Sequence, residues 1–345
     1  MDLTVGSMLA VDGISNGAVY ALIGLATVLV FSVTRILFIA QGEFVVFGAI
    51  TLAQINAGSV PSAIYLLGTL TLGCLLQELW LAWQRRRVDR RLARELARVL
   101  LPSSFIIAVT VLAAPVGLPL ILQALLSLML IAPMGMLVYR LIYRSIADAS
   151  VLTLLIVSVG VHFALVGLGL IFFGPEGYRT SALLDVSVQL GSVPVSGQAI
   201  VVIVTALLLI SLLFWFSTCT FPGMALRAAA VNRLGARIVG LSSDRAGQTS
   251  FILAAAIGAL SGILIAPTTT LYYDTGFLIG LKGFVAAVFA GLSSFPGVMI
   301  GAIGVGLLES FGSFWSSAFK DSIVFGAVIP VLLLRTILTR TQEDH

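Results

Sequence analysis

Four ionisable side chains lie inside long apolar runs, where a charge is costly. They are Glu43, His162, Lys282 and Glu309. Insertion scales put the cost of a charged side chain at bilayer depth at about 2.5–3.5 kcal/mol, so each is a candidate functional residue. Two interpretations of Glu43 stay open: a role near a translocation path, or a hydrogen bond that packs helices. We interpret His162 as a packing residue in preference to a gate or proton relay.

Glycine surrounds two of these residues, which suggests that they meet. Irregular backbone in a membrane is tolerated only where it faces protein or a water-filled cavity. Glu43 and Lys282 both lie in stretches of this kind, so we predict that they form an ion pair beside a translocation path. The predicted path residues are Gln41, Gly42, Glu43, Phe44, Gly280, Lys282 and Phe284.

No constellation for catalysis accompanies these groups. The glycines around Lys282 lack the G-x-x-x-x-G-K-[ST] spacing of a phosphate-binding loop, so any ATPase is another chain. Ser261 and His162 lie in separate apolar runs without the motif of a nucleophile and its base. Two histidines and no HExxH motif give no basis for a catalytic metal. We therefore expect no enzymatic activity, no cofactor and no metal in this chain.

The segment 221–248 is a polar island between two apolar runs. Its four arginines accompany one acid, Asp244. Helix-forming residues predict short helices over 225–231 and 234–239, and Ser242 or Ser243 is placed to cap the next helix. Apolar residues at three- and four-residue steps predict one face that packs against something: Met224, Ala228, Val231, Leu234 and Ile238. The segment is interpreted either as a loop that only sets topology or as a docking element for a soluble partner.

The composition indicates a polytopic membrane protein. Of 345 residues, 59% are hydrophobic and 10% are charged, where soluble domains have about 25% charged residues. Apolar runs of about twenty residues recur, each long enough to cross the hydrocarbon. We predict an all-α fold in a single transmembrane domain, 1–345, with ten or eleven spans. The candidate spans are 8–33, 39–58, 61–83, 102–115, 117–138, 150–173, 198–217, 249–271, 279–293, 297–315 and 321–338.

The positive charges predict the orientation. All but three of the 19 Lys and Arg fall on or near one side of an eleven-span arrangement. The exceptions are Arg179, Lys282 and Lys320. By the positive-inside rule the N-terminus lies outside and the C-terminus in the cytoplasm. The basic charge is loop charge, and no polar domain is present to hold a nucleic acid.

Two further polar segments interrupt the spans. Residues 84–100 are rich in arginine around a narrow apolar stripe, which predicts an amphipathic helix on the cytoplasmic leaflet, held by anionic lipid or by a partner. Residues 174–197 predict an ordered outer loop with a short strand over 186–190.

Three motifs, in order along the chain, resemble the permeases of branched-chain amino acid type ABC importers. Arg35–Phe44 is similar to the family's Asn-Phe-Ala-His-Gly-Glu run, and 276–297 is close to its late pattern rich in glycine. The segment 221–248 looks like the family's cytoplasmic coupling loop. By this resemblance its ATPase-coupling residues are Gly223, Met224, Arg227, Ala228, Asn232, Arg233, Ala236, Gly240 and Asp244. The resemblance covers roughly residues 10–58 and 117–338.

This resemblance implies a permease subunit of an ATP-driven importer in a bacterial inner membrane. It implies a second related permease chain, two cytoplasmic ATPase subunits that bind the ATP, and a periplasmic substrate-binding protein. Phe38 and Gln41 stand where the family has Asn and His. The substrate therefore stays open among branched-chain amino acids, other small amino acids, amides and urea. The alternative is a self-sufficient secondary transporter that uses Glu43 or Glu309 as a proton-coupled carboxylate.

Overall fold

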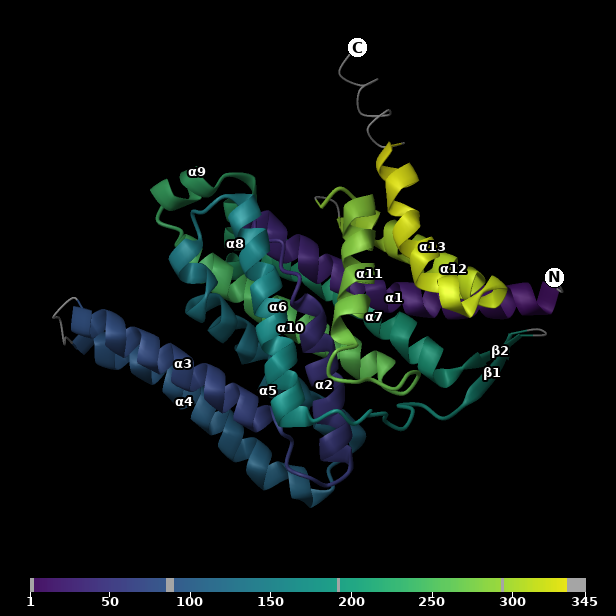
Figure 1. Ribbon diagram of the computed structural model, residues 1–345, viewed down its shortest axis with the longest axis horizontal. Coiled ribbons are helices and arrows are strands. Elements are labelled where there is room, and N and C mark those ends of the chain that lie inside the picture. The colour runs from purple at the N-terminus through teal and green to yellow at the C-terminus, as the bar shows by residue number, and fades with distance from the viewer. Residues whose placement is uncertain (1–2, 85–89, 191–192, 293–294, 334–345) are drawn as a thin grey trace, which may run out of the picture.

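The described part of the chain is helical apart from one short hairpin. The computed structural model describes residues 3–84, 90–190, 193–292 and 295–333, and in them it forms thirteen α-helices (Figure 1). This confirms the all-α class. The helices are α1 (Leu3–Thr34), α2 (Gln41–Asn56), α3 (Ala63–Gln84), α4 (Arg90–Ala113), α5 (Leu120–Leu141), α6 (Val151–Phe173), α7 (Gly197–Cys219), α8 (Phe221–Val231), α9 (Arg233–Ile238), α10 (Ser243–Ile265), α11 (Gly276–Phe289), α12 (Phe295–Trp315) and α13 (Lys320–Gly326).

Eight helices in the described residues are long and apolar enough to cross a membrane: α1, α3, α4, α5, α6, α7, α10 and α12. The prediction of ten or eleven spans counted 39–58, 279–293 and 321–338 as full crossings. Helix α2 has 16 residues and α11 has 14. At 1.5 Å per residue they reach about 24 Å and 21 Å, less than the roughly 30 Å of hydrocarbon. Residues 334–338 of the last predicted span lie outside the described part of the chain.

The separate short span predicted over 102–115 is wrong, because α4 continues through Pro102 as one helix. Of the amphipathic helix predicted over 84–100, residues 85–89 lie outside the described part of the chain, and the rest belongs to α4, which contains an apolar stretch of 25 residues, Leu92–Val116. Two residues of the basic half of α4 contact the protein. Glu95 Oε2 accepts a hydrogen bond from Arg140 of α5 at 2.8 Å, and Val99 is buried. Helices α3 and α4 therefore form an antiparallel pair beside α5 (Figure 1).

Helix α2 is the centre of the molecule. Fourteen of its sixteen residues are buried, between α5, α10 and α11. Small residues permit this close packing. A Cβ on Gly262 of α10 would overlap the carbonyl of Val45, and a Cβ on Gly48 would lie 2.5 Å from Cα of Ala259. A helix buried in this way meets protein on all sides, so its polar residues must find protein partners.

Glycine also brings α1 against α12. A Cβ on Gly13 would lie 2.9 Å from Cα of Leu307, and one on Gly17 would lie 2.8 Å from Cα of Ile303. Figure 1 shows α12 lying across α1. The two helices therefore pack backbone to backbone near both chain ends.

The loop over 174–197 contains strands β1 (Ser187–Leu190) and β2 (Val193–Ser196), paired antiparallel with Ser187 opposite Ser196. The predicted strand over 186–190 is thus confirmed. A bridge between Tyr178 and Leu271 ties this loop to the connection that precedes α11. In Figure 1 the hairpin lies at the opposite end of the molecule from α8 and α9.

Candidate functional site

The segment 221–248 forms two short helices, as predicted. Thr220 caps α8 by accepting a hydrogen bond from the Gly223 amide at 3.2 Å. Asn232 breaks the helix with an extended backbone (φ −146°) and caps α9 through the Gly235 amide at 2.8 Å. Gly240 then reverses the chain with φ of 87°, a conformation suited to glycine, and Ser242 caps α10. The local sequence therefore dictates both helices.

One face of α8 and α9 is packed and the other is bare. The packed face consists of Leu226, Ala229 and Ala236, which form a small core with Val33 at the end of α1. The predicted packing face lies on the other side. Met224 is 46% exposed. Four strongly exposed apolar residues form what we call the coupling ridge: Val231 (84%), Leu234 (70%), Ile238 (79%) and Val239 (75%).

The coupling ridge is an unusual surface for a polar segment, because arginines accompany it and none of the described residues covers it. Arg227 is exposed on α8 beside it, and Ala228 is exposed too. An exposed apolar patch with a polar rim is typical of a protein–protein contact. The arrangement is chemically suited to docking another protein.

Four of the predicted path residues come together at the start of α2. Gln41, Glu43 and Phe44 are each at most 2% exposed. The amide of Gln41 donates to the carbonyl of Ala254 in α10 at 2.7 Å, and Phe44 packs against Phe38 and Phe47. In this conformation the region is closed. Gln41 Oε1 and Glu43 Oε2 are buried without a hydrogen-bond partner among the described residues.

The first turns of α2 and α11 touch at glycines. Gly42 lies against the backbone of Gly276, and a Cβ added to Gly280 would come within 2.9 Å of Cα of Gly42. Neither helix crosses the full hydrocarbon, so their amino ends meet inside the protein. The predicted proximity of the two glycine-flanked stretches is confirmed at Gly42 and Gly280.

The predicted ion pair between Glu43 and Lys282 is wrong. Glu43 Oε1 lies 3.0 Å from Nδ1 of His162 on α6. Lys282 Nζ instead lies 2.5 Å from Glu309 Oε1 and 2.9 Å from Asp321 Oδ1. The reason is helix geometry: Lys282 is two residues past Gly280, and two residues rotate a side chain by about 200° around the axis. Gly280 faces α2, so Lys282 faces away from it.

The remaining predicted path residue, Phe284, is only partly buried on α11. Sequence reasoning missed two partners of Lys282. The hydroxyl of Tyr20 on α1 donates to Glu309 Oε2, and Lys282 Nζ lies 5.8 Å from the centre of the Tyr20 ring. Asp321 was not singled out either, although an acid at the start of a predicted span is a visible signal. This buried cluster joins α1, α11, α12 and α13.

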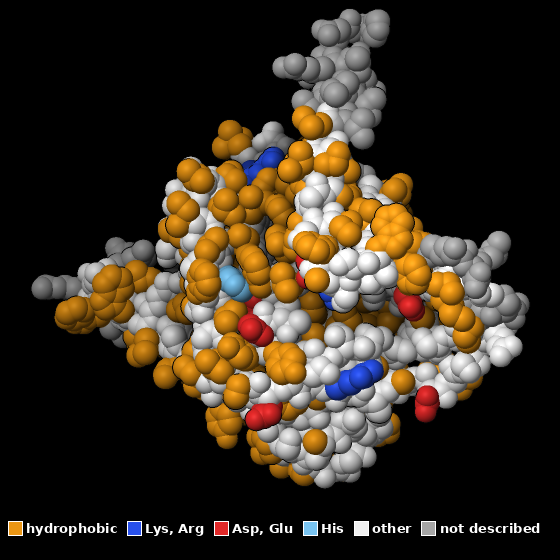
Figure 2. All heavy atoms as spheres, turned by 45° about the vertical axis from the view of Figure 1, so that its right-hand side comes forward, with side chains coloured by type: hydrophobic (Ala, Val, Ile, Leu, Met, Phe, Trp, Pro, Cys, Tyr) orange, Lys and Arg blue, Asp and Glu red, His pale blue; other side chains and the backbone are white. Residues whose placement is uncertain are grey.

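Figure 2 shows a face covered largely by hydrophobic side chains, as contact with lipid requires, with a histidine and acidic side chains grouped within it. Helix α6 supplies much exposed apolar surface, with Leu152, Ile156, Phe163 and Ile171 each at least 65% exposed. These surfaces and the eight apolar helices make the chain a multi-pass membrane protein.

Known proteins resemble the chain over nearly its full length. The family model described as "Branched-chain amino acid transport system / permease component" matches residues 9–334. The high-affinity branched-chain amino acid transport system permease protein LivH of Salmonella typhimurium is 25% identical over 333 residues, which cover 94% of this chain and 91% of that protein. The corresponding permease protein BraD of Pseudomonas aeruginosa is 28% identical over 63% of this chain and 74% of its own length.

Another matching protein is named for a different substrate. The xylose/arabinose import permease protein XylH of Sulfolobus acidocaldarius is 32% identical over 192 residues, 52% of each chain. No solved structure matches the chain significantly. Since the family model spans almost the whole sequence, the chain belongs to the permease-component family of branched-chain amino acid transport systems.

Proposed function

We propose that this chain is the membrane-spanning permease subunit of an ATP-driven ABC importer. The observation that carries the proposal is the coupling ridge, an apolar surface exposed on two short helices next to arginine side chains. The sequence has no nucleotide-binding motif, so in an ATP-driven importer another chain must hydrolyse the ATP. The coupling ridge offers a surface to which that chain can bind. The ATP is bound by the partner.

The proposed assembly has the coupling ridge on the cytoplasmic side of a bacterial inner membrane. Two ATPase subunits dock there, one on this chain and one on a second, related permease chain. The β1–β2 hairpin at the opposite end lies on the periplasmic side, within reach of a soluble binding protein. The N-terminus is then outside and the C-terminus inside, with anionic lipid around the basic residues of 84–100.

The proposed substrate is a branched-chain or other small amino acid. The family and the relatives LivH and BraD carry branched-chain amino acid transport in their names, whereas XylH carries a sugar. We place the translocation path beside the amino ends of α2 and α11. Gln41, Gly42, Glu43 and Phe44 flank it on α2. Gly280 and Phe284 flank it on α11, whereas Lys282 of the same helix turns away toward Glu309.

The alternative, a self-sufficient secondary transporter, depends on a carboxylate that is free to bind and release a proton. Glu309 has Lys282 and Tyr20 as partners, and Glu43 has His162. These partners favour a structural role for Glu309 over proton coupling.

The test compares the wild-type chain with a variant of the coupling ridge, each purified together with its ATPase subunits. Leu234→Glu with Ile238→Glu places two carboxylates on exposed positions, so the fold is retained while an apolar contact is lost. We expect the ATPases to dissociate and ATP-driven uptake in vesicles to stop. Ile238→Leu keeps the apolar surface and serves as the matched control. Uptake by the chain alone, without ATP or partners, would contradict the proposal.

A further inference from the structure

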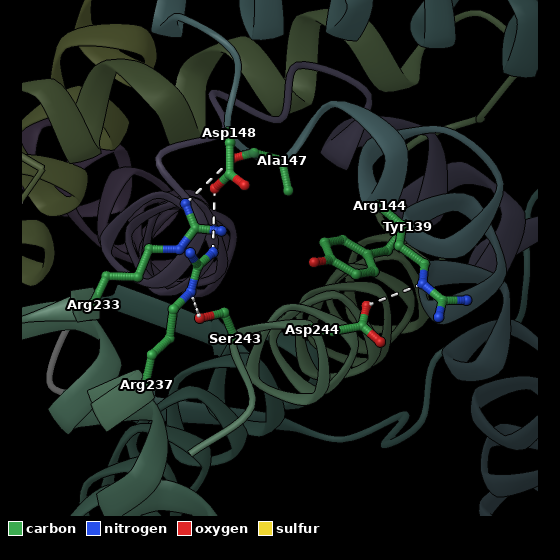
Figure 3. A pocket seen from close by; sticks show the side chains of 8 residues that line it. All are labelled: Tyr139, Arg144, Ala147, Asp148, Arg233, Arg237, Ser243 and Asp244. Atoms are coloured by element: carbon green, nitrogen blue, oxygen red, sulfur yellow. Dashed lines mark hydrogen bonds and ion pairs between the residues drawn. The ribbon is translucent and has the colours of Figure 1, made fainter. Parts of the chain in front are cut away.

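A cavity of about 250 Å³ lies between the coupling helix α9 and the ends of α5 and α10 (Figure 3). It is lined by Tyr139, Arg144, Ala147, Asp148, Arg233, Arg237, Ser243 and Asp244. Seven of these eight side chains carry a charge or a hydroxyl that can form hydrogen bonds, Ala147 being the exception. The cavity leaves unfilled space beside Arg233 and Arg237 of α9, while Ala236 of the same helix stays packed in the small core with Val33.

Helix α9 is tied across this cavity to the connection between α5 and α6. The guanidinium of Arg237 donates to Asp148 Oδ1 at 3.2 Å, and its Nε donates to Ser243 Oγ at 2.8 Å. Arg233 donates to the carbonyl oxygen of Ala147 at 3.2 Å. Two arginines one turn apart therefore hold two consecutive residues of a segment that is about ninety positions away in sequence.

The α5–α6 connection is itself fixed to α6. Ser150 caps α6 by accepting a hydrogen bond from the Thr153 amide at 3.2 Å. The hydroxyl of Tyr143 lies 2.8 Å from that of Ser158 inside the core, and Tyr143 is completely buried. Burial raises the pKa of the Tyr143 phenol well above its ordinary value, so this hydroxyl stays protonated. A pull on residues 147 and 148 is therefore transmitted to α6 as a unit.

Helix α6 carries the imidazole that contacts the predicted path. His162 on α6 bonds to Glu43 at the start of α2, and its ring packs 4.8 Å from that of Phe277 at the start of α11. A continuous series of contacts thus runs from α9, through the α5–α6 connection and α6, to the place where α2 and α11 meet.

We propose that Arg233 and Arg237 are positioning residues that pass the movement of α9 to α6 through Ala147 and Asp148. This inference rests on the proposed function, because it needs an ATPase to move α9. The Arg237–Asp148 pair is exposed, at 47% and 78% of the two side chains. An exposed pair contributes little to folding stability. Its loss therefore leaves the fold intact and affects the transmission of movement.

The test uses the full complex of permease chains, ATPases and binding protein in lipid vesicles, with ATP hydrolysis and solute uptake measured together. Asp148→Arg and Arg237→Asp each replace the attraction by a repulsion. We expect each to assemble and hydrolyse ATP, while solute carried per ATP falls about fivefold or more, the usual lower range of coupling between sites. Asp148→Arg with Arg237→Asp restores the opposite charges and is expected to recover the wild-type ratio.

Two controls separate this inference from a general defect. Asp148→Glu keeps the carboxylate and is expected to keep the ratio of solute carried per ATP. The milder Arg237→Gln removes the ion pair with Asp148 without introducing a repulsion. An unchanged ratio in both charge-reversed variants would overturn the inference, as would failure of the double variant to recover. Failure of the wild-type complex to couple ATP to uptake would instead overturn the proposed function.

Discussion

Lys282 and Glu309 form an ion pair of 2.5 Å between α11 and α12, with Asp321 2.9 Å from the same ammonium group. The hydroxyl of Tyr20 satisfies the second oxygen of Glu309. The ammonium group of Lys282 thus contacts two carboxylates that come from different helices. The cluster holds α11, α12 and α13 together by charge where glycine-rich packing leaves few large side chains.

Removal of that cation is expected to destabilise the protein strongly. Lys282→Met leaves Glu309 buried without its partner, a change that typically costs about 3–5 kcal/mol. Lys282→Met combined with Glu309→Gln removes both charges and should recover much of this loss. Thermal unfolding of the detergent-solubilised protein measures both effects. A Lys282→Met variant that unfolds at the wild-type temperature would show that the pair contributes nothing.

Arg35, the residue after α1, adopts a left-handed backbone. Its φ is 62°, and its amide donates to the carbonyl of Phe31 at 2.8 Å, which is the way a helix commonly ends at glycine. We expect Arg35→Gly to be more stable than Arg35→Ala by about 1 kcal/mol, since both lose the charge and only glycine relieves the strain. Chemical denaturation of the two variants, compared directly, decides this. Equal stability would mean that a side chain at position 35 causes no backbone strain.

The elements best predicted from the sequence are those fixed by neighbouring residues. Ser242 caps α10, and Gly240 reverses the chain after α9. Both effects depend only on residues a few positions away in the sequence. The strand over 186–190 followed from alternation in the same way. The continuity of α4 through Pro102 was not predicted, because a proline inside a helix removes a backbone hydrogen bond and usually ends or kinks it.

A methyl group at Gly42 is expected to prevent correct folding. The added Cβ would overlap the carbonyl of Gly276, and backbone cannot turn aside as a flexible side chain does. Overpacking of this kind costs about 1–3 kcal/mol or more. Gly160→Ala is the matched control, because it lies on a helix with no atom within 4 Å of the new Cβ. Yield and gel filtration in detergent compare the two, and a well-folded Gly42→Ala would disprove the close contact of α2 with α11.

The candidate site was predicted only in part, because its side chains come from distant parts of the sequence. Charge and glycine identified Glu43 and Lys282 as unusual residues, and the structure brings their helices into contact at Gly42 and Gly280. Sequence does not show which way a side chain turns on a helix whose start is unknown. The sequence therefore did not show that Glu43 contacts His162, or that Lys282 contacts Glu309 and Asp321.

The pair of Glu43 and His162 gives the sharpest test of the path. A glutamine at position 43 is close in size to the native residue and can still hydrogen bond to the imidazole, so Glu43→Gln should unfold near the wild-type temperature. Glu43→Ala leaves the imidazole without its acceptor and should lose about 1–3 kcal/mol of stability. If Glu43 lies beside the translocation path as proposed, uptake by Glu43→Gln should fall by about tenfold, which corresponds to about 1.4 kcal/mol. Thr51→Val, at a buried position of the same helix, controls for substitutions that only alter packing. Uptake that follows stability alone across these variants would assign Glu43 to the packing of α2 against α6.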